Sequence, residues 1–109
     1  MICSQWDVVV VPFPFTDEPG AKKRPALVLT NMVFNKNGHT VLAMITTKRH
    51  LPWPGDSEIE EYSAAGLNLS CQVRFKIFTL DNRLLLKKIG HLVEKDSKRV
   101  KENLHHYFL

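Results

Sequence analysis

Four consecutive valines, Val8 to Val11, are followed at once by Pro12-Phe13-Pro14, and this junction restricts the fold more than any other stretch of the chain. Valine is β-branched and favours extended backbone, whereas proline cannot continue a helix or a central strand. The pattern predicts a first strand that runs into a stiff, extended loop. Turn residues follow from Asp17 to Gly20, so the chain is expected to reverse there.

Two further apolar runs, Pro25–Thr30 and Thr40–Thr47, lack the in-and-out alternation of a half-exposed sheet. We therefore expect two strands that are covered on both faces. Asn35-Lys36-Asn37-Gly38 lies between them and is a cluster of turn residues. The two strands are accordingly predicted to form an antiparallel hairpin.

The second half of the chain predicts two more strands separated by irregular segments. Lys48 to Ser57 contains two prolines and a glycine and is expected to be a long loop. Tyr62 to Leu67 is predicted to form a helical turn. Gln72–Thr79 and Leu85–Val93 are predicted to be strands. The first alternates between apolar and charged residues, as in a strand with one face exposed to solvent.

The end of the chain predicts one amphipathic helix, capped at its start by Asp96 or Ser97. Its apolar stripe consists of Val100, Leu104, Tyr107 and Phe108. Five or six short strands with few helices favour a curled β-barrel or a strongly bent sheet. No internal repeat or linker divides the 109 residues, so residues 1–109 are predicted to form a single domain.

The net charge and the two cysteines indicate which partners and which kinds of site are expected. The net charge of +4 favours a polyanionic partner, because it raises the local concentration of such a partner and its encounter rate. Cys3 and Cys71 have no Cys-x-x-Cys neighbour and no histidine at zinc-ligand spacing, so neither a disulfide framework nor a metal site is predicted. The apolar run at Val8 is too short for a membrane span. A reducing cytoplasm is the expected location.

The predicted hairpin brings two polar residues together. If the hairpin turns near Asn35-Lys36, paired residues have numbers that sum to about 71, which places Arg24 opposite Thr46 or Thr47. Arg24 precedes a proline and is held in extended backbone. A guanidinium beside threonine hydroxyls at the rim of a sheet is a plausible phosphate receptor. The alternative is an arginine that only solvates a strand end, beside a threonine that only favours the strand.

Several stretches together resemble the MazF/PemK family of toxins from bacterial toxin–antitoxin modules. They are "DVVVVPFPFTD", "KKRPALVLTN", "AMITT", "GLNLSCQVRFKIFTLD" and "KKIGHL", followed by the closing helix. The resemblance implies a mainly β fold, an SH3-like barrel of MazF/PemK/CcdB type, in which a strongly curled antiparallel sheet carries a C-terminal helix. It also implies a homodimer that cuts single-stranded RNA without a metal or other cofactor and is inhibited by a cognate antitoxin.

The resemblance carries over to individual residues. The family's Arg-Pro arginine falls on Arg24 and its Ile-Thr threonine on Thr46, so these two are the predicted catalytic residues. The Gln-x-Arg stretch of many members falls on Gln72 and Arg74, which are predicted to contact RNA. One departure is that the family's first strand usually opens with Gly-Asp, whereas Trp6 precedes Asp7 here. We expect tryptophan not to adopt the positive φ that glycine allows, so that the turn is rebuilt or the entry to the groove differs.

Further candidates surround the predicted catalytic pair. The proposed RNA-binding residues are Lys22, Lys23, Thr47, Lys48, Arg49, Trp53, Gln72 and Arg74. Trp53 could stack on a base or could instead anchor its own loop. His39 and His50 are candidates for moving protons near neutral pH, because histidine titrates in that range.

Two other functions remain open from the sequence alone. One is a toxin of the CcdB kind, which shares this barrel and acts by binding gyrase. The other is a nucleic-acid-binding barrel that has lost catalysis. The Arg24/Thr46 pair argues against the CcdB kind, whose mode of action does not need it, and incubation of the purified protein with single-stranded RNA in EDTA would separate all three functions.

Overall fold

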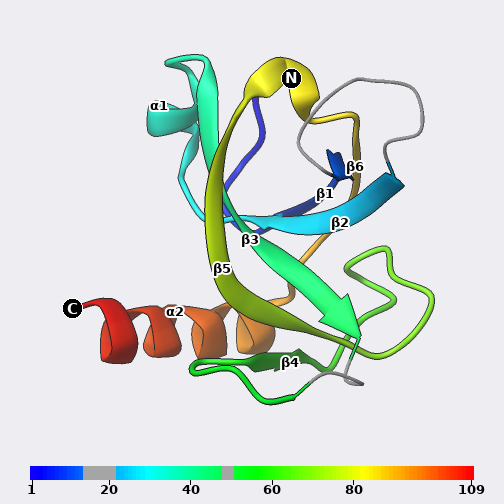
Figure 1. Cartoon of the computed structure of the whole chain (residues 1–109), viewed down its shortest axis with the longest axis vertical. Helices are drawn as coiled ribbons and strands as arrows, with labels where there is room; N and C mark the ends of the chain where they lie inside the picture. The colour runs from blue at the N-terminus through cyan, green and yellow to red at the C-terminus, as the bar shows by residue number, and fades with distance from the viewer. Residues whose placement is uncertain (14–21, 48–50) are drawn as a thin grey trace.

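A computed structural model describes residues 1–13, 22–47 and 51–109, in which six strands form one antiparallel sheet of order β4-β5-β3-β2-β1-β6 (Figure 1). The strands are β1 (Asp7–Phe13), β2 (Lys22–Val28), β3 (His39–Thr47), β4 (Ser57–Ile59), β5 (Cys71–Asp81) and β6 (Lys87–His91). The helices are α1 (Met32–Asn35), the short 3₁₀ helix η1 (Asn82–Leu84) and α2 (Glu94–Phe108). The expected mainly β fold, a curled antiparallel sheet with a C-terminal helix, is confirmed.

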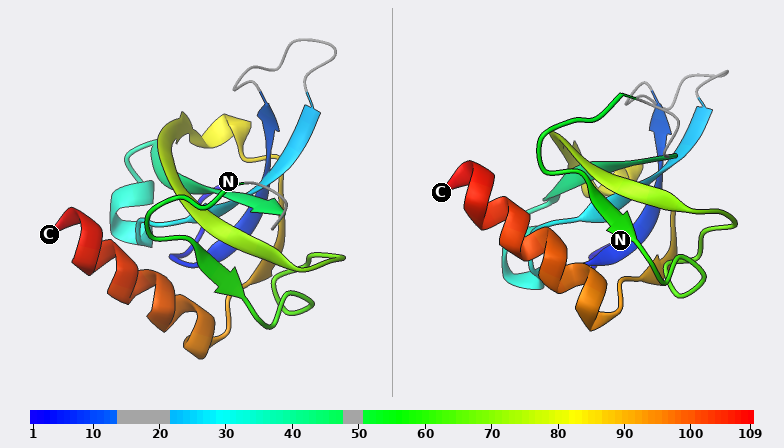
Figure 2. Two further views of the ribbon diagram at one scale, coloured as in Figure 1. Left: turned by 60° about the horizontal axis from the view of Figure 1, so that its bottom comes forward. Right: turned by 90° about the horizontal axis from the view of Figure 1, so that it is seen from below.

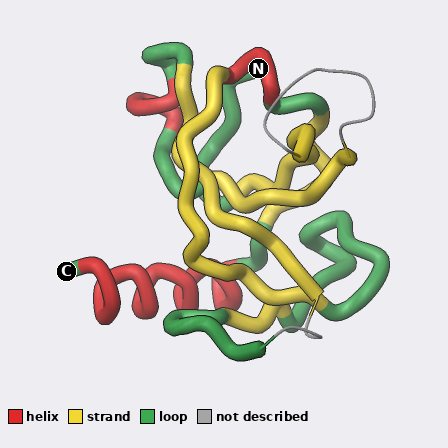
Figure 3. The backbone as a smooth tube through the Cα atoms, in the orientation of Figure 1, coloured by secondary structure: helices red, strands yellow, loops and turns green. Residues whose placement is uncertain are grey.

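The sheet curls so that each of its faces covers a separate apolar core. Val8 and Leu27 belong to a core that also receives Val100 of α2, while Val9 and Val11 belong to a second core on the other face. Neighbouring residues of a strand point to opposite faces, so a run of valines serves both cores at once. Figures 2 and 3 show that α2 lies along β4, and that β3 and β5 are strongly curved strands that lie side by side.

β2 and β3 form the predicted antiparallel hairpin. Ala26 pairs with Met44, and the numbers of paired residues sum to 70, one less than the turn count predicted. The connection contains α1, which was not predicted. Asn31 caps this short helix, because its side-chain oxygen accepts a hydrogen bond from the backbone N–H of Phe34 at 3.1 Å.

β2 begins at Lys22, three residues before the predicted start at Pro25. The reason lies in β1, which continues through Pro12 to Phe13 and pairs Pro12 with Lys23. Lys22, Lys23 and Arg24 are therefore strand residues with exposed side chains rather than part of a turn.

Between β3 and α2 the chain differs from the prediction in three places. Ser57, predicted to end a loop, begins the three-residue strand β4, which pairs with β5 through Ser57 and Val73. Residues 62–67 form hydrogen-bonded turns, including one from the N–H of Leu67 to the carbonyl of Tyr62 at 3.0 Å, and no helix. β6 is shorter than predicted, covering Lys87–His91.

α2 begins at Glu94 with Val93 at its N-cap, so the predicted cap at Asp96 or Ser97 is wrong. The Asp96 carboxylate is buried and instead accepts hydrogen bonds from the backbone N–H groups of Glu60, at 3.2 Å, and Glu61, at 3.0 Å. Asp96 thereby fastens the residues after β4 to the first turns of the helix. No helix in the described part of the chain is long and apolar enough to span a membrane.

Trp6 adopts a φ of +72°, which corrects the expectation that tryptophan would avoid the positive-φ conformation. Its N–H donates to the carbonyl of Val28 at 2.8 Å, and its carbonyl accepts from the N–H of Leu92 at 3.0 Å. These bonds hold the backbone between β2 and the residue after β6, while the indole packs against the core that contains Val8. These contacts therefore hold Trp6 at a positive φ, a conformation whose strain is about 1–3 kcal/mol for such a residue.

The buried carboxylate of Asp7 joins β1 to β6. It accepts a hydrogen bond from the backbone N–H of Ser4 at 2.8 Å, and it lies 2.7 Å from Nδ1 of His91 and 3.3 Å from Nζ of Lys88. Burial acts to raise the pKa of Asp7, but the hydrogen bonds from His91, Ser4 and Lys88 together lower it below its ordinary value. Asp7 is therefore held as a carboxylate at neutral pH.

Candidate functional site

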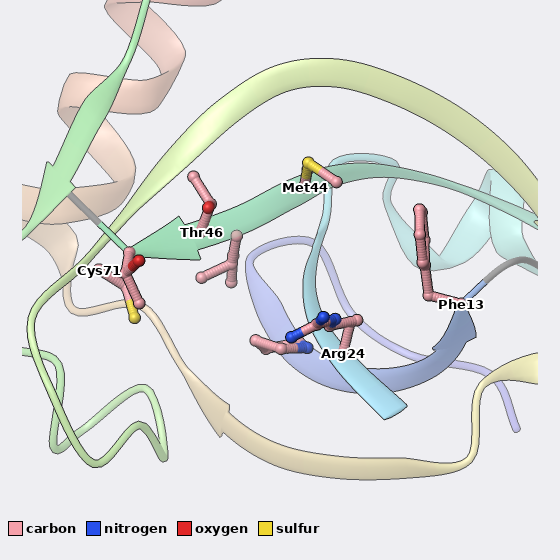
Figure 4. Close-up of a pocket in the computed structure, with 8 residues that line it drawn as sticks. Phe13, Arg24, Met44, Thr46 and Cys71 are labelled. Atoms are coloured by element: carbon pink, nitrogen blue, oxygen red, sulfur yellow. The ribbon is translucent and has the colours of Figure 1, made fainter. Parts of the chain in front are cut away.

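A pocket of about 280 Å³ opens at the place where β2 and β3 stop pairing. Its lining comes from the four strands β1, β2, β3 and β5: Phe13, Arg24, Pro25, Met44, Ile45, Thr46, Thr47 and Cys71. The last observed pair of the hairpin is Ala26 with Met44, and beyond it the two strands part. The space between them is the pocket, with Arg24 on the β2 side and Thr46 on the β3 side (Figure 4).

The structure brings Arg24 and Thr46 to this one pocket. Extending the pairing of Ala26 with Met44 by two residues sets Arg24 against Thr46, as the register argument predicted. Arg24 is exposed, so its guanidinium is accessible to a ligand, while Thr46 is half-buried. Pro25 fixes the backbone between Arg24 and the buried part of β2.

Sequence reasoning missed Phe13, Met44 and Cys71 as pocket residues. Phe13 keeps 39 % of its surface exposed at the pocket, whereas Cys71 is buried at the opposite wall, next to its strand partner Thr47. Burial raises the pKa of the Cys71 thiol, which favours its neutral form at this wall. A prediction of which strand pairs with β3 would have placed it here.

Several predicted RNA-binding residues lie around the pocket. Thr47 lines it, and Gln72 pairs with Thr46 from the neighbouring strand β5. Lys22 and Lys23 precede Arg24 on β2 and are exposed. Three exposed cations thus occupy consecutive positions of β2, where Lys22 shares a face with Arg24 and Lys23 points to the opposite face.

Arg74 is placed differently from the other predicted RNA-binding residues. Only 6 % of its surface is exposed, and its guanidinium donates to both carboxylate oxygens of Asp56, at 3.1 Å and 2.9 Å, and to the carbonyl of Leu51 at 2.7 Å. Hydrogen bonding to Asp56 raises the pKa of Arg74 further. The guanidinium of Arg74 is thus hydrogen-bonded inside the protein. Trp53, which lies between Leu51 and Asp56 in the chain, is in contrast 42 % exposed.

The predicted proton-transfer residues are not gathered at the pocket. His39 is the first residue of β3 and pairs with Asp81, seven residues from Thr46. At about 3.3 Å per residue this puts His39 roughly 23 Å from Thr46 along the strand, too far for direct proton transfer. Lys48, Arg49 and His50 lie outside the described residues.

The pocket combines one fixed cation, two threonine side chains and apolar walls. An arginine guanidinium is not deprotonated in proteins and offers several donors in a planar fork, so it suits a phosphate that gains charge during a reaction. Nowhere in residues 1–13, 22–47 and 51–109 do three or more histidine, cysteine or acidic side chains gather as metal ligands would.

Comparison with protein families gives one match over most of the chain. Residues 4–108 match the family described as PemK-like, MazF-like toxin of type II toxin-antitoxin system. No curated protein sequence matches the chain.

Solved structures with the same fold are toxins of this kind. MazF from Deinococcus radiodurans superposes with a TM-score of 0.75 at 20% identity, over 99% of this chain and 97% of that one. An endoribonuclease in complex with its cognate antitoxin, from a Mycobacterial species, gives 0.76 at 18% identity, over 97% and 94%. Mycobacterium tuberculosis toxin MazF-mt6 gives 0.75 at 21% identity, over 94% and 95%. At sequence identities of 18–21%, the similarity to these structures shows the fold alone.

Proposed function

The chain belongs to the PemK-like, MazF-like toxins of type II toxin-antitoxin systems, and from that membership we propose that it is an endoribonuclease that cleaves single-stranded RNA at short sequences. The observation that carries the proposal is the meeting of Arg24 and Thr46 at one pocket, where β2 and β3 part. Lys22 and Lys23, exposed on the same strand as Arg24, add to the positive charge that attracts a polyanionic substrate.

The proposed reaction uses the ribose 2′-hydroxyl of the substrate as the nucleophile. Its oxygen forms a bond to the adjacent phosphorus while the bond from phosphorus to the 5′ oxygen of the next nucleotide breaks. The 2′-hydroxyl loses its proton and the departing 5′ oxygen gains one. The products are a 2′,3′-cyclic phosphate and a 5′-hydroxyl, and no metal is required to generate the nucleophile.

Arg24 is assigned to the phosphate. Negative charge on the non-bridging oxygens grows as the fifth bond to phosphorus forms, and the guanidinium stabilises that charge more in the transition state than in the bound substrate. Thr46, across the pocket, would donate its hydroxyl to a phosphate oxygen and fix the orientation of the group. The groups that move the two protons are left unassigned, because His39 lies at the far end of β3.

Incubation of the purified protein with a long single-stranded RNA in EDTA, followed by sequencing of the 5′ ends, tests this function. We expect cleavage at one short motif, and Arg24→Ala should lower turnover by about 10²- to 10³-fold. Lys101→Ala, which removes an exposed cation from α2, is the matched control and should cleave normally. Cleavage by Arg24→Ala at the wild-type rate would contradict the assignment.

The same experiment separates the two alternatives. Binding of RNA without cutting would indicate a nucleic-acid-binding barrel, and absence of both would favour a toxin that acts on a protein such as gyrase.

Family membership further supports three proposals about the molecule in the cell: a homodimer, a cytoplasmic location and inhibition by a cognate antitoxin. One similar structure is of an endoribonuclease with its cognate antitoxin, and another is of MazE with MazF. Light scattering on the purified protein would test the first, since a dimer has twice the mass of the chain.

A further inference from the structure

The loop that leads into β4 is held by several side-chain contacts. Residues 51–57, here called the Trp53 loop, receive the buried guanidinium of Arg74 through Asp56 and the carbonyl of Leu51. The Asp56 carboxylate also accepts the backbone N–H of Trp53 at 2.9 Å. One carboxylate therefore connects the backbone beneath Trp53 to a buried side chain of β5.

The helix α2 holds the Trp53 loop from its other side. Nδ2 of Asn103 donates to the hydroxyl of Ser57 at 2.7 Å and to the carbonyl of Gly55 at 3.3 Å. Gly55 has a φ of +83°, and a Cβ at this position would lie 2.6 Å from the ring of Phe75. The loop therefore follows a path that both β5 and α2 impose.

Trp53 itself is presented to solvent by this rigid loop. Nζ of Lys76 lies 4.9 Å from the centroid of its ring, in a cation–π contact. Loop residues 52–56, together with Asn103 and Tyr107, line an open groove of about 430 Å³ beside the indole, here called the Trp53 groove. An aromatic face, a nearby cation and an open groove are the features that stack a nucleobase and attract its phosphate.

The Trp53 loop is anchored to the same face of the sheet as the Arg24–Thr46 pocket. Arg74 pairs with Met44, and Gln72 pairs with Thr46, so the two β5 side chains stand on the face that carries Met44 and Thr46. Lys76, under Trp53, is four residues beyond Gln72 on β5. The register of β5 shifts between Arg74 and Ile77, so this spacing is at most roughly 13 Å, and Trp53 is not among the residues that line the pocket.

We propose that Arg74, Asp56 and Asn103 are positioning residues that hold Trp53 as a preformed stacking platform for a base flanking the cleaved bond. The proposal rests on the proposed function and adds a second substrate subsite to it. A preformed loop loses little conformational freedom on binding, so more of the stacking energy appears as affinity. The occupant is single-stranded RNA because Lys76 adds positive charge at the indole to the net charge of +4.

Substrate length gives the first test. On an RNA of about twelve nucleotides, Trp53→Ala should raise KM by about 10-fold or more with kcat nearly unchanged, because base stacking on an aromatic contributes binding rather than chemistry. On a minimal oligonucleotide that cannot reach the platform, the same variant should match the wild type. Trp53→Phe should restore most of the affinity. Leu86→Ala, which removes another exposed apolar side chain, is the control.

Positioning is tested by the fluorescence of Trp53 in a Trp6→Phe background, where it is the sole tryptophan. Asn103→Ala and Asp56→Asn should lower its anisotropy and raise KM for the long RNA only, while the circular dichroism spectrum stays native. A 2′-O-methyl RNA, which lacks the nucleophile, should quench this fluorescence in the parent. That readout does not depend on cleavage, so it remains decisive even if the proposed activity is absent.

Three results would overturn the proposal. The first is equal KM values for Trp53→Ala and the wild type on the long RNA. The second is unchanged anisotropy in both Asn103→Ala and Asp56→Asn. The third is quenching by an acidic peptide but not by 2′-O-methyl RNA, which would assign the Trp53 groove to a protein partner.

Discussion

Thr46 offers the pocket one hydroxyl, and two substitutions separate this hydroxyl from the packing of the side chain. Thr46→Val keeps the branched shape and removes the hydroxyl, so we expect kcat to fall about 100-fold, as for the loss of one oxyanion donor. Thr46→Ser keeps the hydroxyl and should retain most of the activity. Single-turnover cleavage of an RNA that contains the motif measures both. A loss of activity in Thr46→Ser together with full activity in Thr46→Val would show that Thr46 acts through packing.

Because of Asp7, the free energy of unfolding is expected to change with pH in the acid range. Its pKa is lower in the folded protein than the ordinary value of 3.8, so its contribution is fully present above pH 3.8 and is lost as the pH falls through the folded value. We expect Asp7→Asn to cost about 1–3 kcal/mol at pH 6, typical of a broken buried hydrogen-bonded group. The difference from the wild type should shrink below pH 3.8.

Urea unfolding at pH 6 and near pH 3 measures this difference. Asp81→Asn is the control, since Asp81 also has a lowered pKa but lies at the surface end of β5 with an exposed partner, Arg83. A difference between wild type and Asp7→Asn that stays constant with pH would show that Asp7 acts through its shape rather than its charge.

At the level of single residues, sequence reasoning succeeded where local rules fix the geometry. Pro25 and the hairpin register predicted that Arg24 would lie near Thr46 or Thr47, and all three residues line one pocket, because both arguments depend on short-range covalent and pairing rules. The burial of Arg74 was not predictable in this way. Its partner Asp56 lies in an irregular loop, and no local rule states where such a carboxylate folds back.

Gly66 and Gly90 lie where the turn at residues 64–66 packs closely against β6. A Cβ at Gly90 would lie 2.2 Å from the carbonyl carbon of Ala65 and 2.6 Å from the nitrogen of Gly66. These neighbours are backbone atoms and cannot rotate away, so Gly90→Ala should cost about 2–3 kcal/mol, the upper part of the range for overpacking.

Gly38→Ala is the matched control for Gly90→Ala. Gly38 has a φ of +105°, and a Cβ added there would meet no heavy atom within 4 Å, so its substitution tests backbone strain without a clash. Thermal unfolding should therefore show a larger loss for Gly90→Ala than for Gly38→Ala. The reverse order would mean that the turn at residues 64–66 moves aside at little cost.

Among the elements, long periodic segments were predicted and short ones were missed. α1 and β4 have four and three residues, too few for a hydrophobic period to appear in the sequence. The start of α2 was placed late because Asp96 has the chemistry of a capping residue. In the folded chain its carboxylate is used by the N–H groups of Glu60 and Glu61, a tertiary contact that overrides the local preference.

At the scale of the whole molecule, the cations at the end of β2 predict a salt-dependent affinity for RNA. If Lys22, Lys23 and Arg24 each neutralise one phosphate, the logarithm of the association constant should fall with the logarithm of salt concentration with a slope of about −2. Binding of a 2′-O-methyl RNA between about 50 and 200 mM NaCl measures the slope.

A double variant, Lys22→Ala with Lys23→Ala, should reduce this slope by about 1.4. Lys98→Ala with Lys101→Ala removes the same charge from exposed positions of α2 and should leave the slope nearly unchanged. Equal effects of the two double variants would mean that RNA responds to the overall charge of the protein and not to a track beside the pocket.

Because β1 lies between β2 and β6, the sheet is completed only after the C-terminal part of the chain has been synthesised. A chain that is still being translated contains Arg24 and Thr46 well before it contains β6 and α2. Until those last segments emerge, β1 lacks one neighbour and the core around Val8 lacks Val100. Pairing between distant segments is completed late in folding. For a toxin, this order means that the unfinished chain already carries Arg24 and Thr46 but lacks the strand and the helix that complete the sheet and its core.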